Sequence, residues 1–365
     1  MDFAFSPEAY EAAALAATIL RDATTPERLR AAEADGDRWD GDLWRSLADA
    51  GLLALSIPEA HGGADLGLVE ACRVVVEAGR AVAPVPIATH LAVAHLLGDV
   101  LPVGVVSYWL PRAARGEALL SAAVAEDHAW LPAQPTCTAE REGDGWRLRG
   151  TKTLMDAGMR ADAFFVTASS SQGPVVVLVR PDDEGVVREP QRTSDGSVHA
   201  RATLDVRVPI DRLGGGPGAV RRLHELLTLT GVAHQLGVTQ GALALTAEHA
   251  RTREQFGRPI GTFQAVGQRL ADAYIQTLGQ ELTLWQAAWL LGEGREATEE
   301  LASAALWAAD AGHVVAHTTV HVHGGVGIDL DGTAHRYFTA AKRWEFTHGA
   351  GTQHARTLGA ALTAN

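Results

Sequence analysis

The sequence predicts an α+β protein with an N-terminal helical domain, a middle antiparallel, β-barrel-like domain and a C-terminal four-helix bundle. Three observations predict this order. Up to about residue 116, apolar residues recur at helical spacing between proline and glycine stops. From 117 to 215, short alternating segments are separated by turn residues. From 216 onward, long helical stretches are separated only by short glycine-rich breaks. We therefore expect domains at 1–116, 117–215 and 216–365.

The N-terminal domain is predicted from its helix boundaries. Ser6-Pro7-Glu8 places a capping residue before a proline and a carboxylate, the order that begins a helix. A short amphipathic helix over 42–50 can end at Gly51, a residue common just after helices. Two further helices are expected, one over about 66–81 and an apolar one that continues to about residue 97.

The middle domain is predicted from alternating apolar and polar residues. Gly143-Asp144-Gly145 is typical of a tight turn between two antiparallel strands. We expect strands over 119–125, 136–141, 146–154, 163–168, 175–179 and 200–208. These segments make a small all-β module.

The C-terminal domain is predicted from long helices with short connections. It begins after the linker Gly214-Gly215-Gly216-Pro217. Helices are expected over about 218–252, 262–293, 297–323 and 333–362. Long helices joined by short breaks favour an antiparallel four-helix bundle.

Composition and charge exclude several classes of protein. The chain has 365 residues, 47% of them hydrophobic, which is typical of a folded globular protein. With 31 Lys and Arg against 44 Asp and Glu, its formal charge is −13, which argues against generic nucleic-acid binding. Two distant cysteines, Cys72 and Cys137, do not form a disulfide framework. Because no signal-type leader and no membrane-spanning run is found, we expect a cytoplasmic protein.

Three segments carry the most specific motifs. Residues 252–266 read TREQFGRPIGTFQAV, residues 321–327 read HVHGGVG, and residues 51–67 read GLLALSIPEAHGGADLG. Together these segments resemble the acyl-CoA dehydrogenase family, and the first of them is highly specific. The resemblance covers essentially the whole chain, including the order of helical, β and helical parts.

The resemblance implies contact with FAD and an oligomer. In the family, the arginine and phenylalanine at the positions of Arg253 and Phe256 contact the FAD of a neighbouring subunit, and the region of Gly324 and Gly325 contacts it as well. Arginine offers a pyrophosphate a fork of donors, and glycine lets the backbone approach a ligand closely. The alternatives are a surface salt bridge for Arg253 and a plain helix-ending turn for the glycines. The implied assembly is a homo-oligomer or a heterotetramer with a paralogous subunit.

The position of the catalytic base departs from the family pattern. The family reaction is the α,β-dehydrogenation of an acyl-CoA thioester, in which a carboxylate removes the α-proton and the flavin accepts the β-hydride. The glutamate that usually precedes a glycine late in the chain is replaced here by His348. Some members place the base on the first bundle helix, where this chain has Leu227; Glu225 is two residues out of register.

Three positions that usually contact the flavin also differ. The glutamine usually found three residues before the Gly-Gly pair is His321, the cofactor-binding candidate at that position. The Trp-x-Thr signature that lies against the flavin ring reads Leu154-Met155-Asp156. The acidic loop before it, at 125–130, is shortened. Three states of FAD therefore stay open: weak binding, sharing with a partner subunit, or loss.

Three functions stay open at this point. The first is an acyl-CoA dehydrogenase-like flavoprotein for an acyl thioester on CoA or a carrier protein, alone or within a hetero-oligomer. The second is a non-catalytic structural subunit that lends Arg253 to a flavin held by its partner. The third is a redox-independent enzyme on the same scaffold with His348 as acid or base, since histidine exchanges protons near neutral pH. A structural or solvent-exposed His348 is the plainer interpretation. Glu345 could pair with it at helical spacing, but a solvated carboxylate is the plainer interpretation of Glu345.

A row of histidines needs a separate interpretation. His313, His317 and His321 have a spacing of four residues and so share one helix face, which is the spacing of metal ligands. Three ligands on one straight helix do not easily close a tetrahedral site, and no cysteine or glutamate motif flanks them. We therefore predict no metal site and interpret the row as packed or interface histidines.

Overall fold

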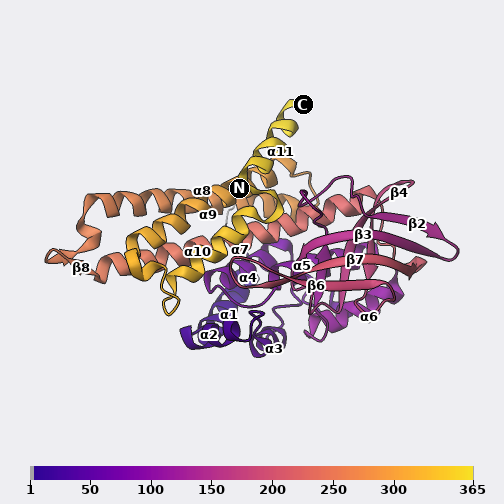
Figure 1. The fold of residues 1–365 in the computed structure, drawn as a ribbon, viewed down its shortest axis with the longest axis horizontal. Coiled ribbons are helices and arrows are strands. Elements are labelled where there is room, and N and C mark those ends of the chain that lie inside the picture. Colours follow the sequence, from indigo (N-terminus) through magenta and orange to yellow (C-terminus); the bar gives the residue numbers. More distant parts are fainter. Residues whose placement is uncertain (1–3, 365) are drawn as a thin grey trace. The chain divides into compact units, whose positions relative to one another are not determined.

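The computed structural model describes residues 4–364, which divide into two compact units (Figure 1). The sheet unit comprises Ala32–Ala71 and Pro84–Thr230. The bundle unit comprises the described residues up to Ala31, Cys72–Ala83 and the residues from Gly231 on. The order of helices, then strands, then helices confirms the predicted α+β class. The boundaries expected at 116/117 and 215/216 stay a prediction.

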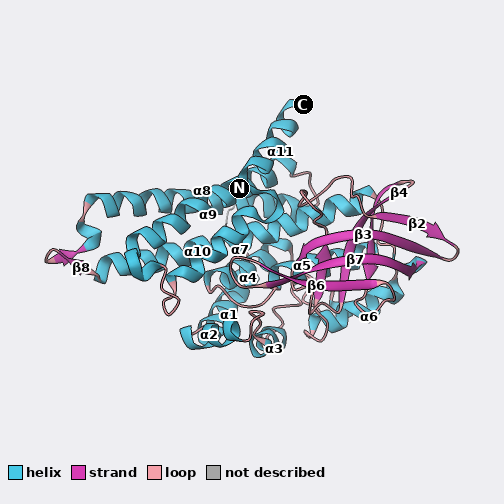
Figure 2. Ribbon diagram, viewed as in Figure 1, coloured by secondary structure: helices cyan, strands magenta, loops and turns pink. Residues whose placement is uncertain are grey.

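The sheet unit is built on a seven-stranded sheet in the order β1-β4-β2-β3-β7-β6, with β5 paired to β4 (Figure 2). The strands are β1 (Leu120–Ala123), β2 (Thr138–Glu142), β3 (Gly145–Met155), β4 (Ala163–Ser170), β5 (Gly173–Val179), β6 (Val186–Arg192) and β7 (Val198–Pro209). The predicted strands are all present, and β2 pairs with β3 through the expected turn, where Gly143 has φ +60°. Their inward residues form a core that includes Leu148, Phe164 and Val206.

Two features of the sheet differ from the prediction. The sheet is not purely antiparallel, because β1 and β2 both pair with β4 in parallel. Strand β6 was not predicted, because its sequence VVREPQR carries charges and Pro190, whose missing N–H is tolerated only at an edge or a bulge. Its place at the end of the strand order explains why that composition is accepted.

Helices in and around the sheet unit follow their capping residues. Asp40 caps α3 (Gly41–Asp49) by accepting from the backbone N–H of Leu43 at 2.8 Å, and Gly51 follows with φ +74°. Helix α5 spans Ile87–Val100, and the unpredicted α6 spans Val103–Ala114 despite Pro111 near its end. The unpredicted α2 (Pro26–Ala34) and the predicted α4 (Leu68–Arg80) each contribute residues to both units.

The bundle unit contains the long helices. They are α7 (Pro217–Thr252), whose first part belongs to the sheet unit, α8 (Gln264–Gly292), α9 (Thr298–His323), α10 (Ala334–Phe346) and α11 (Ala350–Ala364). The N-terminal helix α1 (Pro7–Ala23) also belongs here, capped as predicted by Ser6, whose Oγ accepts from the N–H of Ala9 at 3.0 Å. In Figure 1 the helices α7 to α10 run beside one another.

The helix predicted over 333–362 is wrong in one respect. It is broken between α10 and α11 by the turn Thr347–Gly349. His348 has φ +65° and Ala350 has φ +59°, positive values that glycine adopts readily and other residues adopt only with strain. The break includes His348, the residue that the resemblance places at the position of the catalytic glutamate.

Among the residues that the structure describes, no helix is long and apolar enough to cross a membrane.

Candidate cofactor and active-site regions

A short hairpin presents the two residues predicted to contact FAD. Strands β8 (Glu254–Gln255) and β9 (Arg258–Pro259) are joined by Phe256 and Gly257, with φ +54° and +75°. Positive φ at both central residues is the geometry of a tight hairpin turn, in which a bulky Phe256 is strained. Its side chain is nevertheless 92% exposed. Backbone strain together with exposure of an aromatic ring is typical of a residue that contacts a ligand or a partner chain.

The backbone of Arg253 is hydrogen-bonded, whereas its side chain is exposed. Its N–H donates to the carbonyl of His249 at 2.8 Å, and its own carbonyl accepts from the N–H of Ile260 at 2.8 Å. The guanidinium is exposed and, within residues 4–364, makes no salt bridge. The alternative interpretation of Arg253 as a surface ion-pair residue therefore has no support in the bundle unit.

The glycine turn lies close to this hairpin. The turn η4 (Gly324–Gly327) follows α9, and the ring of His323 at the end of α9 stacks on His249 of α7, with centroids 4.2 Å apart. His249 is one helical turn before Arg253. The structure thus brings the predicted residues Arg253, Gly324 and the neighbouring Gly325 to one end of the bundle.

The glycines of this turn are required for different reasons. Gly324 has φ +64°, and a Cβ on Gly327 would lie 2.8 Å from the carbonyl oxygen of Val320. Both are explained by a helix-ending turn. Gly325 has an ordinary φ, and a Cβ there would meet nothing within 4 Å. Among the described residues nothing demands glycine at this position, which leaves room for close approach by a group from outside the chain.

The side chain of His321 points to a different side of α9 from that of His323. It is exposed on α9, and two residues turn a helix by about 200°, so its side chain leaves the opposite side from His323. It continues the face of His313 and His317, whose rings are 4.5 Å apart. No group of residues that could hold a metal ion is found among the described residues, His321 and its row included. The cofactor role predicted for His321 stays a prediction.

His348 lies among aromatic rings. A Cβ on Gly231 of α7 would lie 3.0 Å from the ring of Trp344 and 3.1 Å from Nδ1 of His348, so both side chains pack directly on the α7 backbone. Trp344 also stacks on His234 with centroids 4.7 Å apart. An imidazole in this position cannot replace a carboxylate base without a change in chemistry. The catalytic role predicted for His348 stays a prediction.

The carboxylates near the two possible base positions are paired with cations. Glu345 accepts from Nζ of Lys342 at 2.6 Å and lies 3.0 Å from Nδ1 of His313, so it is not the solvated carboxylate that the sequence suggested. The carboxylate of Glu225 lies 3.7 Å from the guanidinium of Arg222 and 3.8 Å from that of Arg221. Neither arrangement is that of a base poised for an α-proton.

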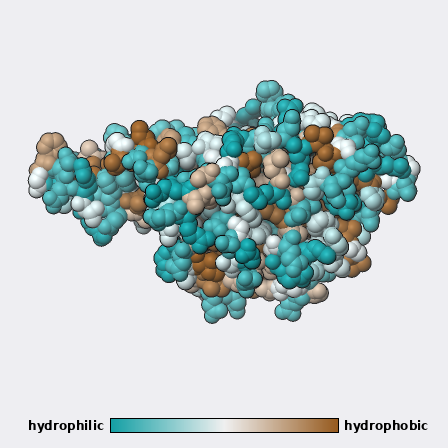
Figure 3. Space-filling view, turned by 60° about the horizontal axis from the view of Figure 1, so that its bottom comes forward, coloured by the Kyte–Doolittle hydropathy of each residue, from teal (hydrophilic) through white to brown (hydrophobic). Residues whose placement is uncertain are grey.

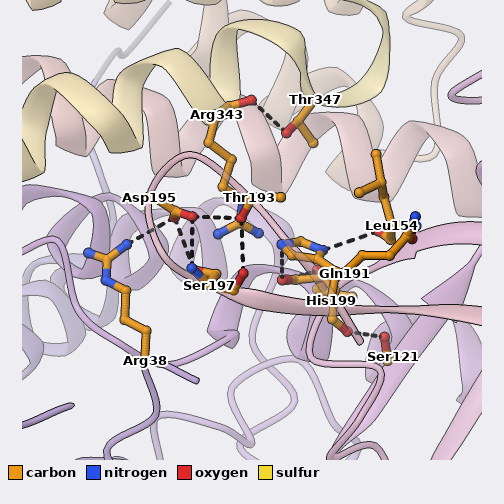
Figure 4. Close-up of polar contacts among 12 residues, drawn as sticks. Arg38, Ser121, Leu154, Gln191, Thr193, Asp195, Ser197, His199, Arg343 and Thr347 are labelled. Carbon is orange, nitrogen blue, oxygen red and sulfur yellow. Dashed lines mark hydrogen bonds and ion pairs between the residues drawn. The ribbon is translucent and has the colours of Figure 1, made fainter. Parts of the chain in front are cut away.

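In the sheet unit, the segment Leu154–Asp156, which replaces Trp-x-Thr, is hydrogen-bonded to other side chains of this chain (Figure 4). The N–H of Leu154 donates to Oε1 of Gln191 at 2.8 Å, and its carbonyl accepts from Nδ1 of His199 at 3.2 Å. Asp156 accepts from the hydroxyl of Thr89 at 2.7 Å. These groups are already satisfied, and a carboxylate stands at the position where the resemblance expects a threonine. The segment does not fit a flavin ring.

The shortened loop carries a buried ion pair that the sequence analysis missed. The carboxylate of Glu126 accepts from Nζ of Lys152 at 2.7 Å and from the backbone N–H groups of Thr136 and Cys137 at 2.7 and 3.0 Å. Burial would raise the pKa of Glu126, but these hydrogen bonds hold that pKa below its usual value. Lys152 lies on β3 in the core, and no spacing rule pairs it with a loop residue 26 positions away.

A second buried pair closes the turn between β6 and β7. Arg38 donates to Asp195 at 2.9 Å, and Asp195 also accepts from the hydroxyls of Thr193 and Ser197 at 2.7 and 3.0 Å (Figure 4). Arg38 comes from the segment before α3, so the pair fixes that segment to the sheet within one unit. Its role is structural, because the carboxylate is fully occupied.

The two units thus differ in what they offer FAD. The hairpin and the glycine turn fit the diphosphate half of a dinucleotide, with an exposed guanidinium, an exposed ring and an open glycine. The space-filling view in Figure 3 shows hydrophobic residues exposed among polar ones near the end of the bundle that carries this hairpin. The Leu154–Asp156 segment does not fit the isoalloxazine half.

Comparisons with known proteins identify the family that the chain resembles. The family models described as "Acyl-CoA dehydrogenase, N-terminal domain" and "Acyl-CoA dehydrogenase, C-terminal domain" match residues 6–117 and 228–363. Acyl-CoA dehydrogenase FadE27 of Mycobacterium tuberculosis is 42% identical over 99% of both chains. FadE28 of the same organism is 33% identical over 87% of this chain and 91% of its own.

Solved structures show the same relationship. A chain of the ChsE4-ChsE5 complex from Mycobacterium tuberculosis is 41% identical with a TM-score of 0.96 over 100% of both chains. A chain of the Tcur3481-Tcur3483 steroid ACAD is 39% identical with a TM-score of 0.94 over 98% of both. Butyryl-CoA dehydrogenase from Megasphaera elsdenii, 22% identical with a TM-score of 0.89 over 100% of both chains, shares the fold. With both family models and full-length relatives in agreement, the chain belongs to the acyl-CoA dehydrogenase family.

Proposed function

We propose that this chain is the subunit without a catalytic carboxylate in a hetero-oligomeric acyl-CoA dehydrogenase. A paralogous partner supplies the glutamate and most of the flavin site, and this chain completes that site from outside. The substrate is an acyl thioester, and the reaction is its α,β-dehydrogenation. One observation carries the proposal: Arg253 and Phe256, at and beside the hairpin, are exposed, whereas the position at which the resemblance expects the base holds His348.

The residues of this chain have binding roles in the reaction. When bound, FAD supplies the acceptor for the β-hydride. Arg253 would hold its diphosphate by charge-assisted hydrogen bonds, and Phe256 would cover it with an aromatic ring. Gly325 would let the backbone approach without a side chain in the way. The α-proton is removed by a carboxylate of the partner, because this chain offers a histidine against Trp344 at that position.

Two similar structures support a partner that is itself a family member. One is part of a complex of ChsE4 with ChsE5, and the other belongs to the Tcur3481-Tcur3483 steroid ACAD. By analogy, the thioester would carry a steroid-like acyl group, which demands a wide substrate pocket at the partner. The proposal includes a cytoplasmic setting, in which the buried thiols of Cys72 and Cys137 stay reduced.

The test is to express the chain alone and together with a paralogous partner that has the glutamate. We expect no flavin absorbance and no dehydrogenase activity from the chain alone, and both from the complex. Arg253→Ala should release flavin from the complex. Arg251→Ala is the matched control, since Arg251 is exposed two residues away but paired with Glu248. Flavin and turnover in the chain alone, or a flavin-free complex, would refute the proposal.

A His348→Ala variant separates the proposal from a redox-independent enzyme. In the complex, turnover should persist, because the proton is removed by the partner's carboxylate. An activity of the chain alone that disappears with His348 would show that the scaffold carries other chemistry.

A further inference from the structure

Two stacked histidines lie between the hairpin and the glycine turn. His249 belongs to the last turn of α7 and His323 ends α9; their rings are inclined by 21° with centroids 4.2 Å apart. His249 precedes Arg253 by one helical turn, and His323 directly precedes Gly324. Both imidazoles are half-buried, whereas Arg253 beyond them is exposed. No spacing rule in the sequence pairs these two residues.

The hydrogen bonding of His323 leaves one ring nitrogen for another partner. Its Nδ1 lies 2.8 Å from the carbonyl oxygen of Thr319, so Nδ1 carries the hydrogen and donates. The remaining nitrogen, Nε2, becomes a second donor when the ring is protonated. A protonated His323 would therefore keep its bond to Thr319 and donate outward as well.

The two charged groups that act on His249 are both positive. Burial lowers the pKa of His249, and so do the charges of His323 and Arg253. Glu248, the acidic neighbour on α7, is bound to Arg251. Gathering groups of one sign is unfavourable in the chain alone, and a bound anion would reverse that effect.

Other charged groups lie on the neighbouring elements. They are Glu254 and Arg258 of the hairpin, Arg269 and Asp272 on α8, Asp329 and Asp331 after the turn, and His335 and Arg336 on α10. None of these shifts the pKa of His249. Asp329 accepts from the backbone N–H of Asp331, and Arg336 donates to the carbonyl of Gly332, so these groups have partners of their own.

We propose that His249 and His323 form, together with Arg253, a subsite for the diphosphate of a dinucleotide at the open side of Gly325. The inference rests on the proposed function, since FAD is the dinucleotide that the hairpin would meet. It adds two residues for which the family resemblance gave no role. It also makes binding depend on a proton, because an anion favours the charged form of one imidazole.

The sign of the pH dependence follows from this arrangement. Without ligand, His249 has a lowered pKa and is neutral at neutral pH. A bound diphosphate raises that pKa, so binding takes up a proton and is tighter at lower pH. A rise of one pKa unit corresponds to about tenfold in affinity. The two rings are in contact, so we expect the uptake of about one proton rather than two.

The first test uses the chain alone with ADP as the probe. The imidazole C–H signals of His249 and His323 are assigned by NMR with the His249→Gln and His323→Gln variants. We expect ADP to shift both signals and to raise their titration midpoints, whereas adenosine, which lacks the diphosphate, should not. His317→Gln is the matched control, an exposed histidine on α9 that should leave ADP binding unchanged. If ADP leaves both signals unmoved, the subsite does not exist.

The second test uses the complex with a paralogous partner and FAD. Flavin dissociation is measured from pH 8 to pH 6. We expect the complex to bind FAD about tenfold more tightly at pH 6, and either glutamine variant to remove that gain while FAD still binds. If both variants bind FAD as the unchanged complex does at every pH, the inference fails and the proposed function stands. If no complex binds FAD at any pH, the proposed function fails, and the ADP titration decides the subsite independently.

Discussion

The backbone conformation and the exposure of Phe256 are both unusual for a phenylalanine. Its φ of +54° and its 92% exposure disfavour a bulky aromatic in an isolated chain. We predict that Phe256→Asn leaves the free energy of unfolding unchanged or raises it by up to about 1 kcal/mol, because asparagine tolerates this conformation. The same variant should weaken FAD retention of the complex by roughly tenfold, the value of an aromatic contact.

The two effects are measured separately, by urea unfolding of the chain and by flavin release from the complex. Phe263 provides the comparison, since its ring meets Phe256 edge-on at 6.1 Å but is half-buried. Phe263→Leu should lower stability without a selective effect on flavin. A Phe256→Asn chain that is strongly destabilised would show that Phe256 is a packing residue.

Glu126 holds a buried ion pair together in the sheet unit. Replacing it by glutamine leaves the ammonium of Lys152 buried without its counter-charge, a change that costs about 3–5 kcal/mol in comparable cases. Glu140→Gln is the control, because Glu140 is exposed on β2 and only 3.4 Å from an exposed Arg149. We expect a large fall in the unfolding midpoint for the first variant and a change below about 1 kcal/mol for the second.

The same residue predicts an acid response. The pKa of Glu126 is held below the ordinary value of 4.5, so its contribution to stability is present above pH 4.5 and is lost as the pH falls through the lowered pKa. Unfolding midpoints of the parent chain should therefore fall between pH 5 and pH 3 more steeply than those of Glu126→Gln. Parallel pH profiles would contradict the role of the ion pair.

These residues show where prediction from sequence stopped. Arg253 and Phe256 were identified from a specific local run, and their exposure agrees with the expected role. Glu126–Lys152, Arg38–Asp195 and His249–His323 were missed, because each pair joins residues distant in the chain that only tertiary structure brings together. No periodicity or motif encodes such a contact.

At the scale of elements, α4 and α7 meet with their backbones in contact. A Cβ on Gly237 would lie 1.9 Å from the carbonyl oxygen of Val76, and one on Gly79 would lie 2.1 Å from that of His234. Close packing of this kind cannot absorb a methyl group by side-chain movement. We predict that Gly237→Ala destabilises the chain by about 3 kcal/mol, measured by thermal or urea unfolding.

Gly359→Ala is the matched control for that prediction. Gly359 lies within α11, and a Cβ there would meet nothing within 4 Å. Alanine should therefore stabilise the helix by about 0.5–1 kcal/mol. A loss of stability in Gly237→Ala and a gain in Gly359→Ala would separate the effect of close packing from that of helix propensity. Equal changes in stability would show that the α4–α7 contact is looser than described.

Element boundaries were predictable where local residues mark them, and unpredictable where a strained backbone conformation sets them. Ser6 and Gly51 marked a helix start and a helix end correctly. The break at His348 was missed because neither His348 nor Ala350 favours the positive φ that it adopts. Strand β6 was missed because the pairing partner β7, rather than its own sequence, makes it a strand.

At the scale of the whole molecule, an exposed apolar stripe on α8 indicates assembly. Tyr274, Ile275, Leu278, Leu282 and Trp289 are all exposed, by 41–63%. Positions 275, 282 and 289 repeat every seven residues with 278 between them, the spacing of a face that packs on another helix. Among the described residues of the bundle unit nothing covers these side chains, and an exposed apolar stripe of this kind is typical of a surface that packs against another chain.

We predict that Leu282→Glu prevents association with the paralogous partner while the chain still folds, because Leu282 is exposed in the chain alone. Association should weaken by about 100-fold, the effect of losing a central interface residue. Gln172→Glu adds the same charge at an exposed polar position outside α8 and should leave association unchanged. Both are measured by sedimentation of the mixed subunits, with flavin absorbance followed in the same run.

Because the hairpin acts on a flavin held by another chain, loss of the assembly must also release the flavin. A Leu282→Glu complex of unchanged mass would exclude the α8 stripe as the interface, whereas a dissociated complex that keeps its flavin on the partner would show that Arg253 and Phe256 are dispensable.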